Sequence, residues 1–127
     1  MFSDNVTGTI ENGGIINLSG DKAIGIYSIG ANSVSVNNNS GAEIKVGNST
    51  NVLNPSIGIY SENTGNIITN IGTVEAGTSS IGIYSKSGTV AQNGQIKAGS
   101  NGTGIYADGG TVNLNAGSAL ETGANNG

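Results

Sequence analysis

The segment Ile24-Gly25-Ile26-Tyr27-Ser28 decides the fold, because it recurs along the chain. It returns unchanged at residues 57–61 and 81–85, and as Thr-Gly-Ile-Tyr-Ala at 103–107. The steps between the four tyrosines are 33, 24 and 22 residues (27 to 60, 60 to 84 and 84 to 106). Repetition at such a period is typical of solenoids, in which each unit packs on the next. The sequence therefore predicts a stack of similar units.

Two further short apolar segments follow each copy of this motif. The first is rich in β-branched residues, as at 34–36, 66–68 and 88–90, and its last copy is either 110–112 or 112–114. The second has the form aliphatic, polar, small or aliphatic, then Gly, at 44–47, 74–77, 96–99 and 120–123. No stretch shows a 3.6-residue period long enough for a helix. Each unit is thus predicted to contain three strands of four or five residues, separated by turns.

A single unit of this size cannot bury enough apolar surface to fold alone. About five buried aliphatic side chains contribute roughly 10 to 15 kcal/mol, whereas ordering the backbone costs about 1 kcal/mol or more per residue. Stacking closes this deficit, because each strand then pairs in parallel with its equivalent ~4.8 Å away. Left-handed β-helices usually repeat strict hexapeptides, and the longer, looser repeat here favours the right-handed form.

The predicted fold class is therefore all-β: a right-handed parallel β-helix of about five coils, each with three short strands. We expect one domain over residues 1–127, with units near residues 6–23, 24–56, 57–80, 81–102 and 103–123.

The two-residue period of a strand predicts which side chains face inward. It places Ile24 and Ile26 on the inner face and Gly25 and Tyr27 on the outer face. Four tyrosines should then stack outside, namely Tyr27, Tyr60, Tyr84 and Tyr106. At one corner, small and amide residues should form a second row, made of Asn12, Ser40, Asn70 and Gln92.

The outward position of the third segment predicts the register of the stack. It reads Asn17, Lys45, Glu75, Lys97 and Glu121 from unit to unit. Opposite charges thus alternate, and directly opposed like charges would repel. Because each exposed pair is worth only ~0 to 1 kcal/mol, we interpret this ladder as a device for register rather than for stability.

Composition excludes several functions. The net charge is −4 and only 9% of residues are charged, which disfavours nucleic acid or an anionic membrane as a partner. The chain has no Cys or His, and its four basic residues are all Lys, so thiolate and imidazole metal sites and His-based triads are absent. The carboxylates form no convincing cluster. We therefore expect no catalytic residues, no metal, no cofactor and no enzyme activity.

Two features are candidate binding sites, and each also has a purely structural interpretation. The row of tyrosines either stacks on sugars or a partner protein, or stabilises the solenoid by ring packing. The step from Gly47 to Ile57 is ten residues, against four in other units, so residues 48–55 form an insertion carrying Val52 and Leu53. This loop either contacts a partner or folds its two aliphatics back onto a neighbouring turn.

The recurring Ser-Ile-Gly-Ile-Tyr-Ser, with the following Gly-Thr-Val and Ile-Lys-Ala-Gly segments, resembles the passenger repeats of bacterial autotransporter adhesins, especially the fusobacterial type. The resemblance covers residues 6–123. It implies a right-handed β-helix stalk that leaves the cell by type V secretion through an outer-membrane barrel. It also implies display on the bacterial cell surface, where such passengers attach to host cells or other bacteria.

The resemblance leads to three functional hypotheses. In the first, the chain mediates or supports attachment by contacting a surface glycan or protein of a host cell or bacterium. In the alternative, it is a passive stalk or spacer, and more remotely it is a fragment of a polysaccharide-active enzyme. The chain has no recognisable signal peptide, barrel or cap, so we expect an excised fragment that makes no membrane contact itself. Its uncapped end coils predict end-to-end self-association.

Overall fold

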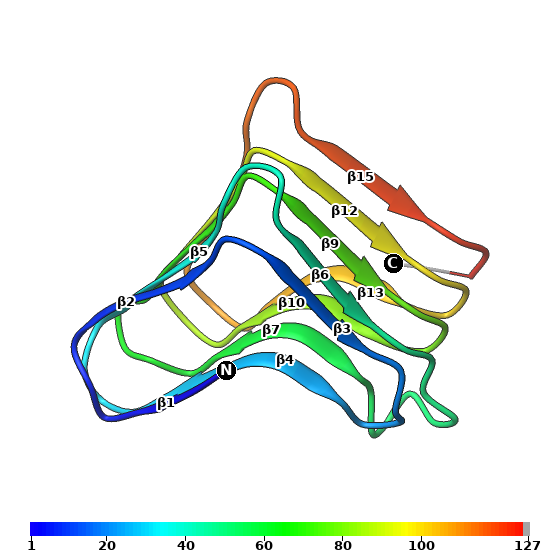
Figure 1. Ribbon diagram of the computed structural model, residues 1–127, viewed down its shortest axis with the longest axis horizontal. Coiled ribbons are helices and arrows are strands. Elements are labelled where there is room, and N and C mark those ends of the chain that lie inside the picture. Colours follow the sequence, from blue (N-terminus) through cyan, green and yellow to red (C-terminus); the bar gives the residue numbers. More distant parts are fainter. Residues whose placement is uncertain (126–127) are drawn as a thin grey trace.

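The computed structural model describes residues 1–125, which form a right-handed parallel β-helix of five turns with three strands per turn (Figure 1). Each of the described strands pairs in parallel with the equivalent strand of the neighbouring turn. Equivalent strands therefore stack into three five-stranded sheets, which enclose a roughly triangular interior (Figure 1). The predicted all-β parallel β-helix is confirmed.

The three sheets are numbered by the order in which the chain enters them. Sheet 1 contains β1 (Phe2–Asp4), β4 (Ile24–Ile29), β7 (Ile57–Ser61), β10 (Ile81–Ser85) and β13 (Thr103–Ala107). Sheet 2 contains β2 (Gly8–Asn12), β5 (Val34–Asn38), β8 (Ile67–Asn70), β11 (Thr89–Gln92) and β14 (Thr111–Leu114). Sheet 3 contains β3 (Ile15–Leu18), β6 (Glu43–Val46), β9 (Thr73–Ala76), β12 (Gln95–Ala98) and β15 (Ala119–Thr122).

The two end turns refine the predicted unit boundaries. The first turn begins before the expected unit at 6–23, because β1 pairs with β4 and places Phe2 beside Tyr27. In the last turn Val112 pairs with Val90, which is an inward residue. The inward aliphatic of this strand is therefore Val112, as in the first of the two predicted alternatives, 110–112.

The interior is built from rows of β-branched side chains that run along the stack. Ile26, Ile59 and Ile83 form one row from sheet 1, and each is fully buried. Sheets 2 and 3 supply the facing rows, whose fully or almost fully buried members are Val34, Val36, Ile44, Ile68, Val74, Val90 and Ile96. Burial thus continues from turn to turn, as a solenoid requires.

The glycine of the repeated motif faces inward, which corrects the predicted outward position of Gly25. A Cβ placed on Gly25 would lie 2.8 Å from the Cγ2 atom of Ile44, which belongs to the core of sheet 3. Gly25 and Ile26 are therefore consecutive inward residues. The simple alternation fails in this sheet, whose strands β4 and β7 follow an arched course (Figure 1), and a glycine inside a strand is typical of such a bend.

A row of buried amides follows sheet 2, with one difference from the prediction. Its members are Asn12, Asn38, Asn70 and Gln92, so Asn38 replaces the expected Ser40. Each amide lies two residues after the inward aliphatic of its strand. The step from Val36 to Ile44 is eight residues, against six in other turns, and the two extra residues lie in the turn after Asn38. The amide therefore keeps its spacing from Val36 and not from Ile44.

Candidate functional site

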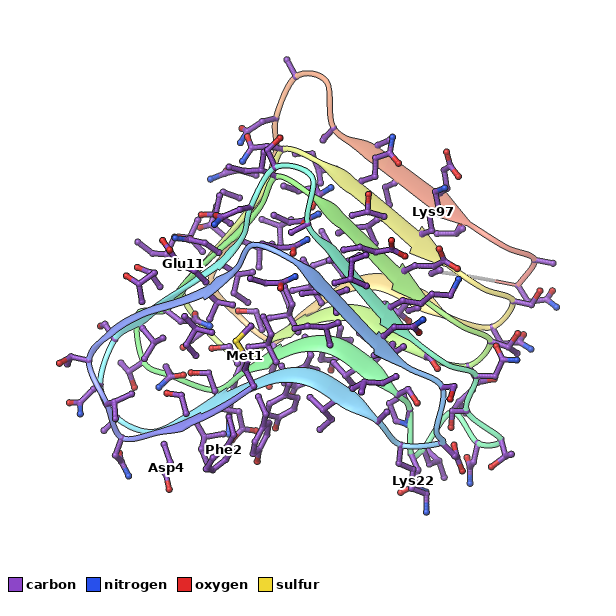
Figure 2. All side chains as sticks on the ribbon, in the orientation of Figure 1. Met1, Phe2, Asp4, Glu11, Lys22 and Lys97 are labelled. Carbon is purple, nitrogen blue, oxygen red and sulfur yellow. The ribbon has the colours of Figure 1, made fainter. Side chains whose placement is uncertain are left out.

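An aromatic stripe runs along the outer face of sheet 1. It consists of Phe2, Tyr27, Tyr60, Tyr84 and Tyr106, one residue from each turn. Successive ring centroids lie 5.5, 5.0, 4.7 and 5.1 Å apart. Figure 2 shows Phe2 and its neighbour Asp4 pointing away from the interior below sheet 1. The four predicted tyrosines are therefore neighbours, and Phe2 extends their row.

Ring stacking limits what the aromatic stripe can bind. Tyr60, Tyr84 and Tyr106 are nearly parallel, with interplanar angles of 7° and 9°, so the rings cover one another's faces. A sugar stacks on the open face of an aromatic ring, whereas this row presents mainly ring edges and hydroxyl groups. Phe2 and Tyr106, at the two ends, are the most exposed of the rings at 66% and 48%.

Charged side chains border the aromatic stripe two residues further along the chain in four of the five turns, and Ile29 takes this position after Tyr27. The Tyr60 hydroxyl donates a hydrogen bond to Glu62, which also lies 3.9 Å from the Lys86 Nζ. Burial raises the pKa of Tyr60, and the hydrogen bond to Glu62 raises it further. Burial likewise raises the pKa of Tyr84, with a smaller contribution from the negative charge of Asp108. These phenols consequently stay protonated at neutral pH.

The insertion at residues 48–55 is a well-bonded loop with two exposed aliphatic side chains. The Ser49 hydroxyl donates to the carbonyls of Asn51 and Asn54, and the loop backbone at Thr50 donates to the carboxylate of Asp21. Val52 is 58% exposed and Leu53 is 83% exposed. The interpretation in which these side chains fold back onto a neighbouring turn is therefore wrong, and the loop presents them to solvent.

The charged residues of sheet 3 lie side by side in the predicted order. Lys45 pairs with Glu75, Glu75 with Lys97, and Lys97 with Glu121 in adjacent strands. The Lys45 Nζ lies 2.7 Å from the Glu75 Oε1, and this hydrogen bond raises the pKa of Lys45. Figure 2 shows Lys97 on the outer side of this sheet. Opposite charges on adjacent strands of sheet 3 thus lie beside each other at the surface, as the predicted register requires.

A shallow groove runs beside this charged row. Its volume is about 330 Å³, and its lining includes Lys45, Glu75, Gly47, Gly77 and Asn48. Sequence reasoning did not find this groove, because it forms where the ends of β3, β6 and β9 and the turns after them stack. It is open to solvent on one side and contains no pair of carboxylates poised for acid–base chemistry.

Residues 1–125 contain no metal-type side-chain cluster and no membrane-spanning helix. No three acidic side chains in that part of the chain gather closely enough to hold a metal ion. None of the described residues belongs to a helix that is long and apolar enough to cross a membrane. No family model, curated protein or solved structure matches the chain.

Two features of the aromatic stripe, the residue Phe2 and the contact with Glu62, were missed by sequence reasoning. Phe2 lay outside the predicted units, although Phe2-Ser3 repeats the aromatic-Ser pair of Tyr27-Ser28 and could have marked a further copy. The contact of Glu62 with Tyr60 was not predictable from the sequence, since it depends on how the chain turns after β7.

Proposed function

We propose that this chain is a rod-forming segment of a surface-displayed, autotransporter-type adhesin passenger, which supports attachment to host cells or other bacteria. In this role it acts as a stalk that carries a binding region away from the cell surface. The observation that carries the proposal is the continuity of all three sheets from end to end.

The exposed interior side chains of the last turn also support a rod. Val112 and Leu120 belong to inward rows, yet they are 38% and 45% exposed, whereas Val90 and Ile96 one turn earlier are buried. Exposed interior side chains at an end of a solenoid are suited to cover by a further coil. The rings of the aromatic stripe also cover one another's faces, which favours the interpretation that the stripe stabilises the solenoid by ring packing.

Labelling of intact cells tests the proposed location. Antibodies raised against the folded chain should label whole cells of the bacterium that encodes it, and external protease should remove the label. Labelling that appears only after the cells are permeabilised would contradict surface display. An antibody against a cytosolic protein of the same cells serves as the permeability control.

Direct binding is the second candidate function, and the exposed loop favours it. Val52 and Leu53 form a small apolar projection that an unidentified surface protein or glycan could contact. A glycan array and a cell-binding assay with the isolated chain separate the two functions. Absence of binding at high micromolar concentration supports the stalk.

Substitutions then identify the binding surface if the isolated chain does bind. Binding that is lost in Leu53→Ser points to the loop, and binding that is lost in Tyr60→Ala with Tyr84→Ala points to the aromatic stripe. The control is Thr111→Ser, an exposed position on sheet 2 that belongs to neither surface. Carboxylate-dependent cleavage of a polysaccharide would instead overturn both binding and stalk functions.

A further inference from the structure

The tyrosines are the main sites at which this chain can lose single electrons. The sequence contains no Cys, Trp or His, and its one Met is Met1. Methionine is oxidised chiefly to its sulfoxide, which is a two-electron reaction. A one-electron oxidant that meets the folded protein will therefore act on the four phenols, all of which lie in the aromatic stripe.

Tyr60 and Tyr84 have the closest and most parallel rings of the stripe. They occupy paired positions in β7 and β10, with ring centroids 4.7 Å apart and an angle of 7° between the ring planes. The Tyr27 ring is tilted by 39° relative to Tyr60, so these two ring faces are not parallel. Two phenoxyl radicals first bond through the π faces of their ortho carbons, which favours the two parallel pairs, Tyr60–Tyr84 and Tyr84–Tyr106. The first pair has the shorter centroid distance and the smaller angle, 4.7 Å and 7° against 5.1 Å and 9°.

Glu62 supplies the proton acceptor that oxidation of Tyr60 needs. A protonated phenol that loses one electron must also lose its proton, because the radical cation is a strong acid. The Tyr60 hydroxyl already donates to the Glu62 carboxylate, so this proton has a short path. The raised pKa of Tyr60 means that the phenolate itself is scarce at neutral pH.

We propose that Tyr60 and Tyr84 form an oxidative cross-linking site, at which hydrogen peroxide acting through a haem peroxidase joins two neighbouring turns as dityrosine. Each phenol loses one electron and one proton to give a phenoxyl radical. The radicals form a carbon–carbon bond between ortho carbons, and the two ortho hydrogens then move to the oxygens as the rings regain aromaticity. The peroxide O–O bond breaks and accepts two electrons and two protons, giving two molecules of water.

This reaction would give the solenoid a covalent link that does not need cysteine. The bond would tie β7 to β10 and close the intervening loop of the chain, which restricts the unfolded state as a disulfide does. Because both rings lie at the surface, they can turn outward as the new bond forms without disturbing Ile59 or Ile83 in the core.

Peroxidase treatment of the dilute, folded chain tests the proposal. We expect dityrosine fluorescence, a monomer mass lower by two hydrogen atoms, and a higher melting temperature. Proteases that cut after Glu and Lys place Tyr60 in residues 46–62 and Tyr84 in residues 76–86. The main cross-linked product should join these two peptides. A product that joins other tyrosines, or that forms mainly between molecules, would overturn the proposal.

Conservative variants separate the site from general tyrosine oxidation. Tyr60→Phe and Tyr84→Phe keep the stacked ring and should each abolish the intramolecular product, whereas Tyr27→Phe should retain it as the matched control. Glu62→Gln should lower the rate of coupling roughly tenfold or more, since it removes the base. An equal yield from the urea-unfolded chain, or an unchanged rate in Glu62→Gln, would contradict the assignment. Circular dichroism of each variant verifies that the fold is retained.

Discussion

The buried amide row shows how single residues hold the stack together. The Asn12 Nδ2 donates to the Asn38 Oδ1 at 2.9 Å, Asn38 donates to Asn70 at 2.8 Å, and Asn70 donates to Gln92 at 3.0 Å. Asn38, Asn70 and Gln92 are fully buried. Asn12, Asn38 and Asn70 thus each link one turn to the next and satisfy polar groups that would be costly to bury unpaired, whereas the Gln92 Nε2 at the end of the row has no partner among the described residues.

Removal of one buried amide side chain should destabilise the protein much more than removal of an exposed amide side chain. We expect Asn38→Ala to cost about 3 kcal/mol in the free energy of unfolding, because it leaves buried groups of Asn12 and Asn70 without that partner. The control is Asn115→Ala, which breaks a similar bond to Asn93 at the surface and should change stability by no more than about 0.5 kcal/mol. Urea denaturation measures both, and equal costs would contradict the role of burial.

The loop at residues 48–55 should loosen in acid through Asp21. Burial disfavours the charged carboxylate, but hydrogen bonds from Ser49 and Thr50 outweigh it and lower the pKa of Asp21 below 3.8. Because the pKa of Asp21 is lowered in the folded state, its ionised carboxylate stabilises the loop above pH 3.8. This stabilisation is lost as the pH falls through the pKa of the folded state. The protection of the Thr50 amide against exchange, measured relative to the intrinsic amide rate at each pH, should therefore fall as the pH drops below 3.8.

The control for this pH effect is Asp21→Asn, in which the amide oxygen can still accept from Thr50 but cannot gain a proton. Thr50 exchange in this variant should follow only the intrinsic pH dependence of amides. The Thr78 amide, which donates to the neutral side chain of Asn48, provides an internal reference. Identical profiles in the two proteins would show that Asp21 does not control the loop.

At the scale of the strand, the inward glycines of sheet 1 set how closely it can approach sheet 3. A Cβ on Gly58 would lie 2.6 Å from the carbonyl oxygen of Gly82 and 2.7 Å from the Val74 Cγ1. The same restriction applies to Gly25 and Gly82 in neighbouring turns. The repeated glycine is therefore required by close packing between sheets, which an alternation of inward and outward residues does not reveal.

The strand-scale prediction is that Gly58→Ala will destabilise the fold by about 3 kcal/mol, since backbone atoms of the next turn cannot move away freely. Gly20→Ala is the matched control, because a Cβ there meets nothing within 4 Å. It should be neutral or slightly stabilising. Thermal unfolding of the two variants gives the comparison, and a Gly58→Ala protein as stable as Gly20→Ala would refute the packing explanation.

At the scale of the whole molecule, both ends of the solenoid leave strand edges without a partner turn (Figure 1). In an in-register head-to-tail stack, Leu120 of one copy would cover Ile16 of the next, following the row seen within the chain. The same register would set Asp108 against Asp4. Apolar cover thus favours association, while this pair of like charges opposes it.

We expect end-to-end association that strengthens at higher salt, as screening weakens the repulsion between Asp4 and Asp108. Sedimentation across concentrations measures it, and a strictly monomeric chain at every concentration and salt would contradict it. Register is tested in Asn17→Cys with Glu121→Cys, because paired strands bring their Cα atoms within the 4.4–6.8 Å span of a disulfide. Oxidation should give a series of multimers. The control, Asn17→Cys with Lys97→Cys, separates the thiols by an extra turn and should not.

The sequence by itself determined the class of fold, the three strands of each turn, the row of tyrosines and the order of charges on sheet 3. These follow from repetition, because identical motifs placed one turn apart must meet in register if their aliphatic residues are to be buried. The position of Val52 and Leu53 on an insertion was also predictable, since it depends only on the spacing of the repeats.

The tertiary structure alone decided the inward glycines, the identity of Asn38 in the amide row, the stacking of ring faces and the contact of Tyr60 with Glu62. These depend on how three sheets bend around one interior and on where each turn places its extra residues. A periodic pattern specifies which residues are neighbours along the stack, but the distance between sheets is set by packing across it.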